Sequence, residues 1–211
     1  MIDPVSSLVV MFSLALLPFA VMAVTSYTKI SIVLSLVRNA VGVQQVPSNM
    51  IINAIALILT CYIMMPVFHA GQTQLLQSRG DGLQRVMDAA EAAKQPFVAF
   101  LAKHTHQQHI DFFMQAAKEM WSPEQAAQVR PSDMLILAPS FLLTELAEAF
   151  RIGFILYLVF VVIDLVVASI LLAMGMSQVS PTNIAIPFKL LLFVALDGWT
   201  KLLQGLVLTY R

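Results

Sequence analysis

The sequence has little charge and almost no cysteine. Only 11% of its 211 residues are charged, 59% are apolar, and 12 basic residues balance 12 acidic ones. A soluble domain carries about 25% charged residues, so an ordinary soluble monomer is excluded, and disorder is excluded because it requires high charge and low hydrophobicity. The absence of a basic excess excludes a nucleic-acid-binding protein. A single cysteine, Cys61, excludes a disulfide scaffold and most metal–thiolate sites. The composition therefore indicates a membrane protein.

Recognisable catalytic motifs are also missing. The chain contains no metalloprotease, nucleophile-elbow, Walker or dinucleotide-binding signature. His104, His106 and His109 form a cluster whose spacing is compatible with a metal site, but Asp111 is the one nearby carboxylate. A solvated helix start is the favoured interpretation. We therefore expect no enzyme, no catalytic residue, no bound metal and no cofactor.

The charge that is present is concentrated in one stretch. Thirteen of the 24 charged residues fall within residues 79–133, which separate two apolar regions. This pattern predicts an N-terminal apolar helical hairpin (1–74), a polar helical insert (75–135) and a C-terminal apolar helical hairpin (136–211). The predicted fold class is all-α and membrane-associated.

Four apolar segments are candidates for membrane helices, which need about 20 apolar residues. They cover residues 4–28, 50–67, 152–174 and 184–210. The fourth is the least regular because Lys189 and Asp197 interrupt it. Prolines within or beside these segments predict kinks, and they are Pro18, Pro66, Pro139 and Pro187. The N-terminal segment lacks a basic region before its apolar run, so we interpret it as retained rather than as a cleaved signal peptide.

The basic residues Lys29 and Arg38 suggest an orientation. They flank the expected connection between the first two apolar helices, with no acid nearby. The positive-inside tendency then predicts a cytoplasmic connection and a polar insert on the opposite side.

The insert itself reads as helical. Residues 81–100 have a helix-forming composition with Pro96 as a predicted break, and residues 110–121 carry an apolar stripe at helical spacing. Ser122 followed by Pro123 is typical of a helix start. Ser132 is a candidate cap for a further helix.

Ionisable residues inside apolar helices need partners, because a charge at the bilayer centre costs about 2.5–3.5 kcal/mol on insertion scales. In an antiparallel hairpin that turns near 176–177, Asp164 and Lys189 lie at similar depth, so an ion pair is one prediction. Separate contacts with water or a neighbouring subunit are the alternative. Glu145, Glu148 and Arg151 share one helix face. That face is either solvated or interfacial, with a local Glu148–Arg151 pair, or part of an inter-subunit ladder.

Several long motifs resemble one family. Residues 38–50 are similar to the signature loop of the type III secretion export-apparatus protein SctR, whose flagellar counterpart is FliP. Residues 149–154 and 162–166 resemble its third helix, and 180–181 with 186–199 resemble its C-terminal motif. Within this loop, the sequence Gln44-Gln45-Val46-Pro47 resembles the virulence injectisome branch of the family more than the flagellar branch. The candidate residues of the loop are Arg38, Asn39, Gly42, Gln44, Gln45, Pro47 and Asn49.

The resemblance implies a structural pore subunit of the bacterial inner membrane with a periplasmic insert. Family members form a pentamer that joins S-type and T-type proteins inside the basal body, and unfolded secreted proteins pass through the resulting helical gate. The resemblance also implies a methionine-rich gasket after the third helix. Here that segment is reduced to Met174, Met176, Ser177 and Gln178. Methionine suits a deformable seal because it is apolar, flexible and unbranched.

Two other functions are alternatives to an export-gate subunit. An ion-coupled small-molecule transporter would use Asp164, Lys189 and Asp197 as a relay, but no inverted repeat relates the two hairpins. An intramembrane enzyme lacks a candidate catalytic set. The sequence therefore favours the export-gate subunit.

Overall fold

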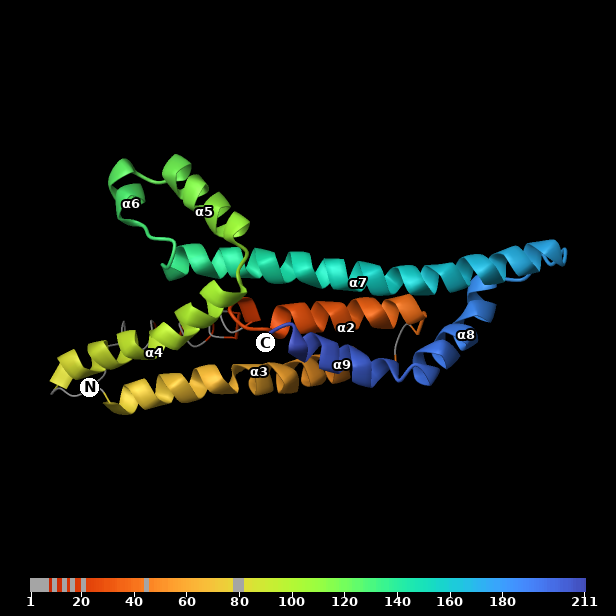
Figure 1. Cartoon of the computed structure of the whole chain (residues 1–211), viewed down its shortest axis with the longest axis horizontal. Helices are drawn as coiled ribbons and strands as arrows, with labels where there is room; N and C mark the ends of the chain where they lie inside the picture. The colour runs from red at the N-terminus through yellow and green to blue at the C-terminus, as the bar shows by residue number, and fades with distance from the viewer. Residues whose placement is uncertain are drawn as a thin grey trace. The chain divides into compact units, whose positions relative to one another are not determined.

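The computed structural model of the chain is built from helices. It describes residues 8, 11, 12, 15, 18, 19, 22–43, 46–77 and 82–211, with side chains except those of 75–77, 82–90 and 93. Within these residues there is no β-strand, which confirms the all-α class. In chain order the helices (Figure 1) are α2 (Tyr27–Val41), α3 (Asn49–Gln77), α4 (Gly82–His104), α5 (Gln107–Met120), α6 (Pro123–Gln128), α7 (Met134–Ala173), α8 (Pro181–Ala195) and α9 (Gly198–Leu208).

Two of these helices are long and apolar enough to cross a membrane. They are α3, over Asn49–Gln74, and α7, over Met134–Ala173, and the pair α8 and α9 would count as a third if it formed one bent span. The 40 residues of α7 correspond to about 60 Å at the helical rise, roughly twice the hydrocarbon thickness of a bilayer. The predicted second and third apolar helices are therefore present. Of the predicted first helix, 4–28, residues 4–7, 9, 10, 13, 14, 16, 17, 20 and 21 lie outside the described residues.

The third helix begins much earlier than residue 152. Its first turn is closed by the Asp133 carbonyl, which accepts hydrogen bonds from the amides of Ile136 and Leu137. The Asp133 carboxylate in turn accepts from the amide of Arg130 at 2.8 Å. The residue that starts the helix is thus Asp133 rather than the predicted Ser132. Pro139 lies inside α7 without ending it.

The predicted fourth helix, 184–210, is wrong as a single element. The chain bends by 62° between α8 and α9. Asp197 at the break has φ 53°, which is left-handed backbone that a residue with a side chain rarely adopts. A Cβ on the next residue, Gly198, would lie 2.5 Å from the ring of Phe193, so glycine is required for this close approach. Composition alone does not reveal such a backbone break.

Helix α2 was not predicted at all. From the sequence, the residues between Lys29 and Arg38 are assigned to the connection between the first two apolar helices. In the structure α2 buries Ile30, Val33, Leu34 and Val37, which recur at helical spacing. This apolar periodicity was the feature of the sequence from which the helix could have been predicted. Lys29 is buried within this helix and Arg38 lies in its last turn, and the orientation inferred from them stays a prediction.

The chain forms two compact units, each assembled from segments distant in sequence. Unit 1 comprises Met1–Thr28 and Met64–Glu145, and unit 2 comprises Lys29–Ile63 and Leu146–Arg211. The boundaries pass through α3 and α7, so each of these helices contributes to both units. The three segments predicted from composition (1–74, 75–135 and 136–211) stay a prediction about the organisation of the sequence.

Unit 1 is held by aromatic contacts. Phe97 of α4 lies edge-on to Phe68 of α3, with ring centroids 5.6 Å apart. Phe100 of α4 lies 5.8 Å from Phe141 of α7. The predicted break at Pro96 is wrong, because α4 continues through it.

The two shorter helices of unit 1 follow the sequence closely. The stripe predicted for 110–121 is present as α5, which buries Ile110 and Ala117. Ser122 caps α6 by accepting a hydrogen bond from the amide of Gln125, and Pro123 stands in the first turn. The predicted helix start at Ser122 is confirmed.

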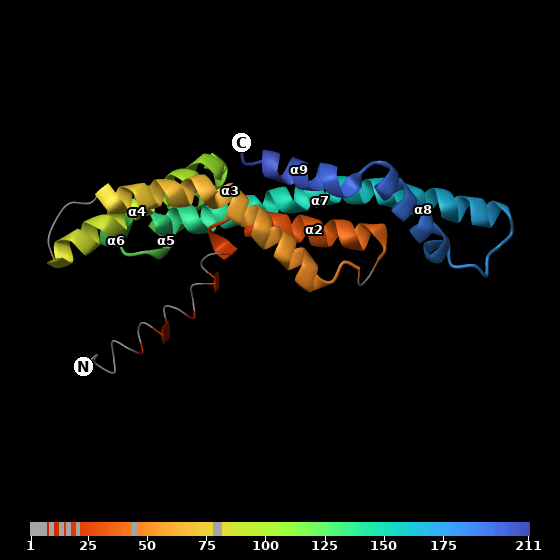
Figure 2. The same ribbon diagram turned by 90° about the horizontal axis from the view of Figure 1, so that it is seen from below.

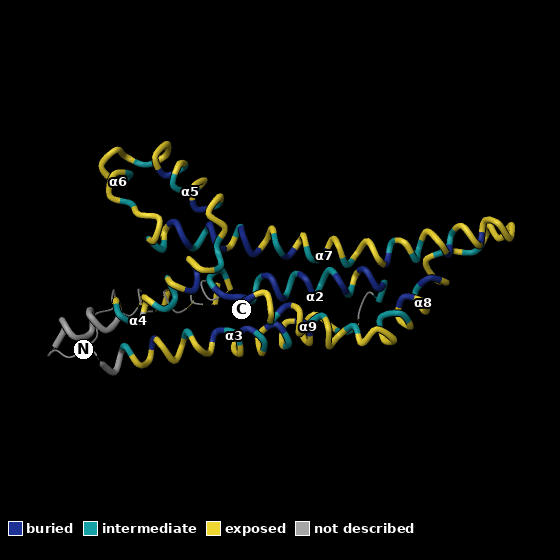
Figure 3. The backbone as a smooth tube through the Cα atoms, in the orientation of Figure 1, coloured by how far each residue is buried: buried dark blue, intermediate teal, exposed yellow. Residues whose placement is uncertain are grey.

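Unit 2 is organised around α2. Figures 1 and 2 show α2 alongside the middle of α7, and Figure 3 shows that α2 is largely buried while the end of α7 is exposed. The two helices come close at Gly153, where an added Cβ would lie 3.2 Å from the Cβ of Leu36. The partner that Gly153 packs against is therefore within the same chain. From the end of α7 the chain turns back into α8, and Val167, Leu171 and Ala185 form the core of that hairpin.

Candidate functional site in the helical bundle

The predicted ion pair between α7 and α8 is present. The Nζ of Lys189 lies 2.7 Å from Oδ2 of Asp164, and it also donates to the carbonyl of Ala40 at 3.1 Å. The Lys189 side chain is 5% exposed and that of Asp164 is 39% exposed. Lys189 of α8 thus contacts both α7 and the end of α2, and the Asp164 carboxylate neutralises its charge within the chain.

The pair meets because of the turn between α7 and α8. Gly175 ends α7 in the left-handed conformation (φ 73°), and the amide of Met176 bonds back to the carbonyl of Leu171. This is the glycine helix-ending motif that satisfies the last carbonyls. The second Asp164 oxygen, Oδ1, is buried and has no hydrogen-bond partner in the described part of the chain.

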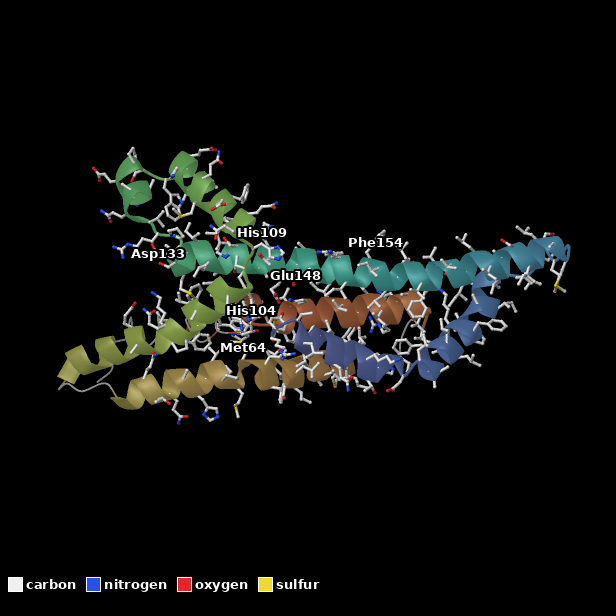
Figure 4. All side chains as sticks on the ribbon, in the orientation of Figure 1. Met64, His104, His109, Asp133, Glu148 and Phe154 are labelled. Carbon is white, nitrogen blue, oxygen red and sulfur yellow. The ribbon has the colours of Figure 1, made fainter. Side chains whose placement is uncertain are left out.

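A second ion pair, between α2 and α7, was not predicted. The Nζ of Lys29 lies 2.7 Å from Oε2 of Glu148 and 4.2 Å from the centroid of the Tyr210 ring. Lys29 is 2% exposed, so its ammonium is stabilised by a carboxylate and an aromatic face in place of water. Figure 4 shows Glu148 on the side of α7 that faces α2. Nothing in the local sequence pairs two residues that are 119 positions apart.

The face predicted from Glu145, Glu148 and Arg151 is divided in the structure. Glu145 is fully buried in unit 1, so the solvated interpretation is wrong for it. The Glu148 carboxylate binds Lys29 of α2, whereas Arg151 is exposed. The inter-subunit ladder stays a prediction.

The motif loop between α2 and α3 is closed by Arg38. Its Nη1 donates to Oδ1 of Asn49 at 2.6 Å and to the carbonyl of Pro47 at 3.2 Å. Gly42 has φ 90°, and its amide bonds to the carbonyl of Asn39. Five of the seven candidate loop residues therefore shape one turn. The other two, Gln44 and Gln45, lie outside the described residues.

The candidate gasket residues occupy the turn between α7 and α8. Met174 is 66% exposed and Met176 is 40% exposed. Ser177 and Gln178 are also exposed. The turn thus presents two thioethers and two polar side chains outward.

The comparisons with known proteins extend over nearly all of the chain. Residues 10–206 match the FliP family. The chain belongs to that family. It is 57% identical over 206 residues to "Pathogenicity-related ORF2" of Xanthomonas campestris pv. glycines, covering 97% of this chain and 95% of that protein. It is 54% identical over 211 residues to "Hypersensitivity response secretion protein HrcR" of Ralstonia nicotianae, covering 98% and 97%.

A more distant relative is also named for the movement of proteins. "Yop proteins translocation protein R" of Yersinia pestis is 43% identical over 210 residues, covering 99% of this chain and 97% of that protein. The resemblance to SctR and FliP is therefore confirmed, and the FliP-family chain is a component of a type III secretion apparatus. The family is not a known enzyme family.

Asp197 does not join the other two ionisable residues of the predicted relay. It lies at the break between α8 and α9, where its Oδ1 accepts a hydrogen bond from the Thr200 hydroxyl at 2.9 Å. In this FliP-family chain the residue shapes the start of α9. The backbone position at φ 53° is the feature that sequence reasoning missed.

The histidines of unit 1 belong to a hydrogen-bonded junction, defined here as His106, His109, Ser140 and Thr144. The Thr144 hydroxyl donates to the Ser140 carbonyl at 2.8 Å and accepts from the His106 amide at 3.2 Å. Its distance to His109 Nδ1 is 2.7 Å. With the hydroxyl proton assigned to the bond with the Ser140 carbonyl, Nδ1 of His109 is assigned as the donor of this bond. Figure 4 shows His109 where α5 meets α7.

The junction explains the histidine spacing that had suggested a metal. The His106 and His109 rings stack with centroids 5.7 Å apart. Among the described residues, no group of three potential ligands lies within reach of a shared ion. The histidines fix α5 to the first half of α7, so the solvated helix-start interpretation misses the contact of His109 with Thr144.

Proposed function

We propose that this chain is a structural subunit of a type III export gate in the bacterial inner membrane, through which unfolded secreted proteins pass. The observation that carries the proposal is the FliP-family match over residues 10–206, together with full-length similarity to proteins named for secretion or translocation. On this proposal the chain forms a homo-oligomer, taken to be a pentamer, with S-type and T-type partners in the basal body.

The distribution of charge in unit 2 supports a structural role. Lys29 and Lys189 are both buried and both paired with carboxylates of α7. With these charges neutralised, α7 presents a broad apolar surface that a soluble monomer would not expose. It includes Phe150, Phe154, Ile155, Leu158, Val162, Leu165, Val166 and Ile170. Such a surface suits packing against neighbouring subunits or lipid.

The turn between α7 and α8 is the proposed gasket. Met174 and Met176 are exposed at the far end of a hairpin whose base is fixed by the Asp164–Lys189 pair. In an oligomer several copies of this turn would converge on one axis. A ring of methionine side chains would seal the resting channel and deform around a passing polypeptide. Ser177 and Gln178 would make this seal more polar than a continuous methionine run.

An ion-coupled transporter is the second candidate function. The observation in its favour is Oδ1 of Asp164, which is buried without a partner in the described part of the chain and resembles a proton-accepting group. The position of Asp197 away from the pair weakens a three-residue relay. The two candidates differ in the effect on secretion expected when Asp164 and Lys189 are both neutralised.

Assembly provides the test of the export-gate proposal. The native mass of the chain, extracted in mild detergent, would be measured with and without co-expressed S-type and T-type partners. We expect a multimer that takes in both partners. A stable monomer or dimer that ignores them would contradict the proposal and favour the transporter.

A further inference from the structure

An apolar cavity of about 460 Å³ lies within unit 2, between α2, α7, α8 and α9. Val37 of α2, Leu156 and Phe160 of α7, Leu192 of α8 and Leu206 of α9 are among the residues that line it. Cavities that hold small ligands are typically about 300–1,000 Å³ and mainly apolar. The size and lining of this cavity match that description.

The bend between α8 and α9 creates this space. Gly198, directly after the break, lines the cavity, and its backbone packs tightly against the ring of Phe193. One turn before the end of α9, Gly205 also lines the cavity, and a Cβ added there would meet nothing within 4 Å. The absence of a side chain at Gly205 therefore leaves volume that the fold does not need for close packing.

The lining contains one charged side chain. Lys201 is exposed, and no ion pair reaches it within the described residues. The nearest acid along α9, Asp197, accepts a hydrogen bond from Thr200. The hydroxyl of Thr209, the other polar side chain of the lining, donates to the carbonyl of Leu206 within its own helix. The cavity thus combines an apolar interior with a single available cation.

We propose that this cavity binds one acyl chain of an anionic membrane phospholipid, whose phosphate is held by Lys201. The helices that line it include α7 and the bent pair α8–α9, which are candidate membrane spans, so bilayer lipid is the amphiphile at hand. Basic pockets between membrane helices select anionic headgroups, and a lysine ammonium reaches a headgroup while its methylene stem covers apolar surface. This inference is independent of whether the chain forms a channel.

Trp199 provides a probe for the site. Its ring lies 5.3 Å from that of Phe193, a lining residue. A Trp121→Phe chain would leave it as the one tryptophan, because the sequence has two. The full-length chain would be placed in phosphatidylcholine nanodiscs to which a lipid with brominated acyl chains is added in increasing fractions. The brominated lipid would be phosphatidylglycerol in one series and phosphatidylcholine in the other. Bromine quenches tryptophan fluorescence at short range.

We expect brominated phosphatidylglycerol to reach half-maximal quenching at about a fivefold lower fraction than brominated phosphatidylcholine. Lys201→Gln should abolish this preference, while Lys118→Gln, at an exposed position of unit 1, should leave it unchanged. Gly205→Leu should fill the cavity without displacing its neighbours and should lower the quenching by both lipids.

Three results would overturn the proposal. Equal quenching by the two lipids would show that Lys201 selects no headgroup. Quenching that is unaffected by Gly205→Leu would show that only lipid around the outside of the protein is detected. An unquenched Trp199 would show that another copy of the chain covers the cavity.

Discussion

The two compact units bury polar groups in different ways. In unit 1 the junction of His106, His109, Ser140 and Thr144 uses hydroxyls, imidazole and backbone groups, and these residues lie 31–38 positions apart across the junction. In unit 2 the buried groups include two ammonium ions, those of Lys29 and Lys189, each 2.7 Å from a carboxylate oxygen, whereas the buried carboxylate of unit 1, Glu145, lies outside the junction. Neutral groups need only hydrogen bonds when they are buried, whereas a buried ion needs an opposite charge as well.

This difference indicates what each unit requires for stability. Loss of a hydroxyl from unit 1 leaves one or two polar groups without a partner. Loss of one ion from unit 2 leaves a charge inside an apolar bundle. We therefore expect substitutions in unit 2 to have the larger effects.

The largest effect is expected at the Asp164–Lys189 pair. Lys189→Gln or Asp164→Asn alone should lower the free energy of unfolding by up to about 3 kcal/mol, a value below the full range for buried pairs because Asp164 is partly exposed. Either change should abolish secretion. The double variant should recover most of the stability and most of the secretion, because two neutral amides replace two charges. Unfolding in mixed micelles and a secretion assay would measure the two quantities.

The double variant also separates the two candidate functions. A structural pair survives joint neutralisation, but a proton or ion relay does not. A double variant that folds and assembles yet secretes nothing would contradict the structural role. Lys118→Gln, an exposed lysine of unit 1, is the matched control and should change neither quantity.

A smaller effect is expected at the contact between α2 and α7. Gly153→Leu would force its side chain into Leu36, which lies 3.2 Å from the added Cβ, and overpacking of this kind costs about 1–3 kcal/mol. The variant should unfold more easily and fail to form the complex on a native gel. Leu36→Ala introduced together with Gly153→Leu should restore part of the lost stability. A normal complex from Gly153→Leu alone would show that α2 and α7 separate without consequence.

The junction of unit 1 should tolerate change better. Thr144→Val keeps the shape but removes the hydroxyl that serves His106, His109 and Ser140, which should cost about 1–3 kcal/mol. Thr144→Ser keeps the hydroxyl and should retain most of the stability. Hydrogen exchange at the start of α5 would measure the effect locally. Equal protection in both variants would show that the junction contributes no stability.

The smallest effect on stability is expected at the turn between α7 and α8. Met176→Asp changes a 40% exposed residue, so unfolding and assembly should be nearly unchanged. If Met176 belongs to a gasket, the charged variant should allow small ions to leak. Conductance across planar bilayers would detect the leak, with Met120→Asp, at an exposed position of unit 1, as the control. Unchanged conductance would remove Met176 from the seal.

The sequence predicted the features that depend on local pattern. The Asp164–Lys189 pair follows from residue spacing in one hairpin, and the Ser122 cap follows from a recognisable tripeptide. The Lys29–Glu148 pair, in contrast, joins residues 119 positions apart, and no local pattern encodes such a contact. Helix α2 was detectable by its stripe of apolar residues, but its 15 residues are fewer than a membrane span requires. The left-handed backbone at Asp197 was not detectable, because the residue type does not predict positive φ reliably.

The most direct test of the export-gate proposal asks whether a secreted polypeptide passes the turn between α7 and α8. Cysteine would be introduced as Met176→Cys in a Cys61→Ser chain and, for comparison, as Glu124→Cys at an exposed position of unit 1. A cysteine-bearing substrate would be stalled during secretion by a folded domain at its C-terminus and treated with a short crosslinker. The proposal predicts an adduct between the substrate and position 176 but not position 124. No adduct at 176 in a chain that still supports secretion would contradict it.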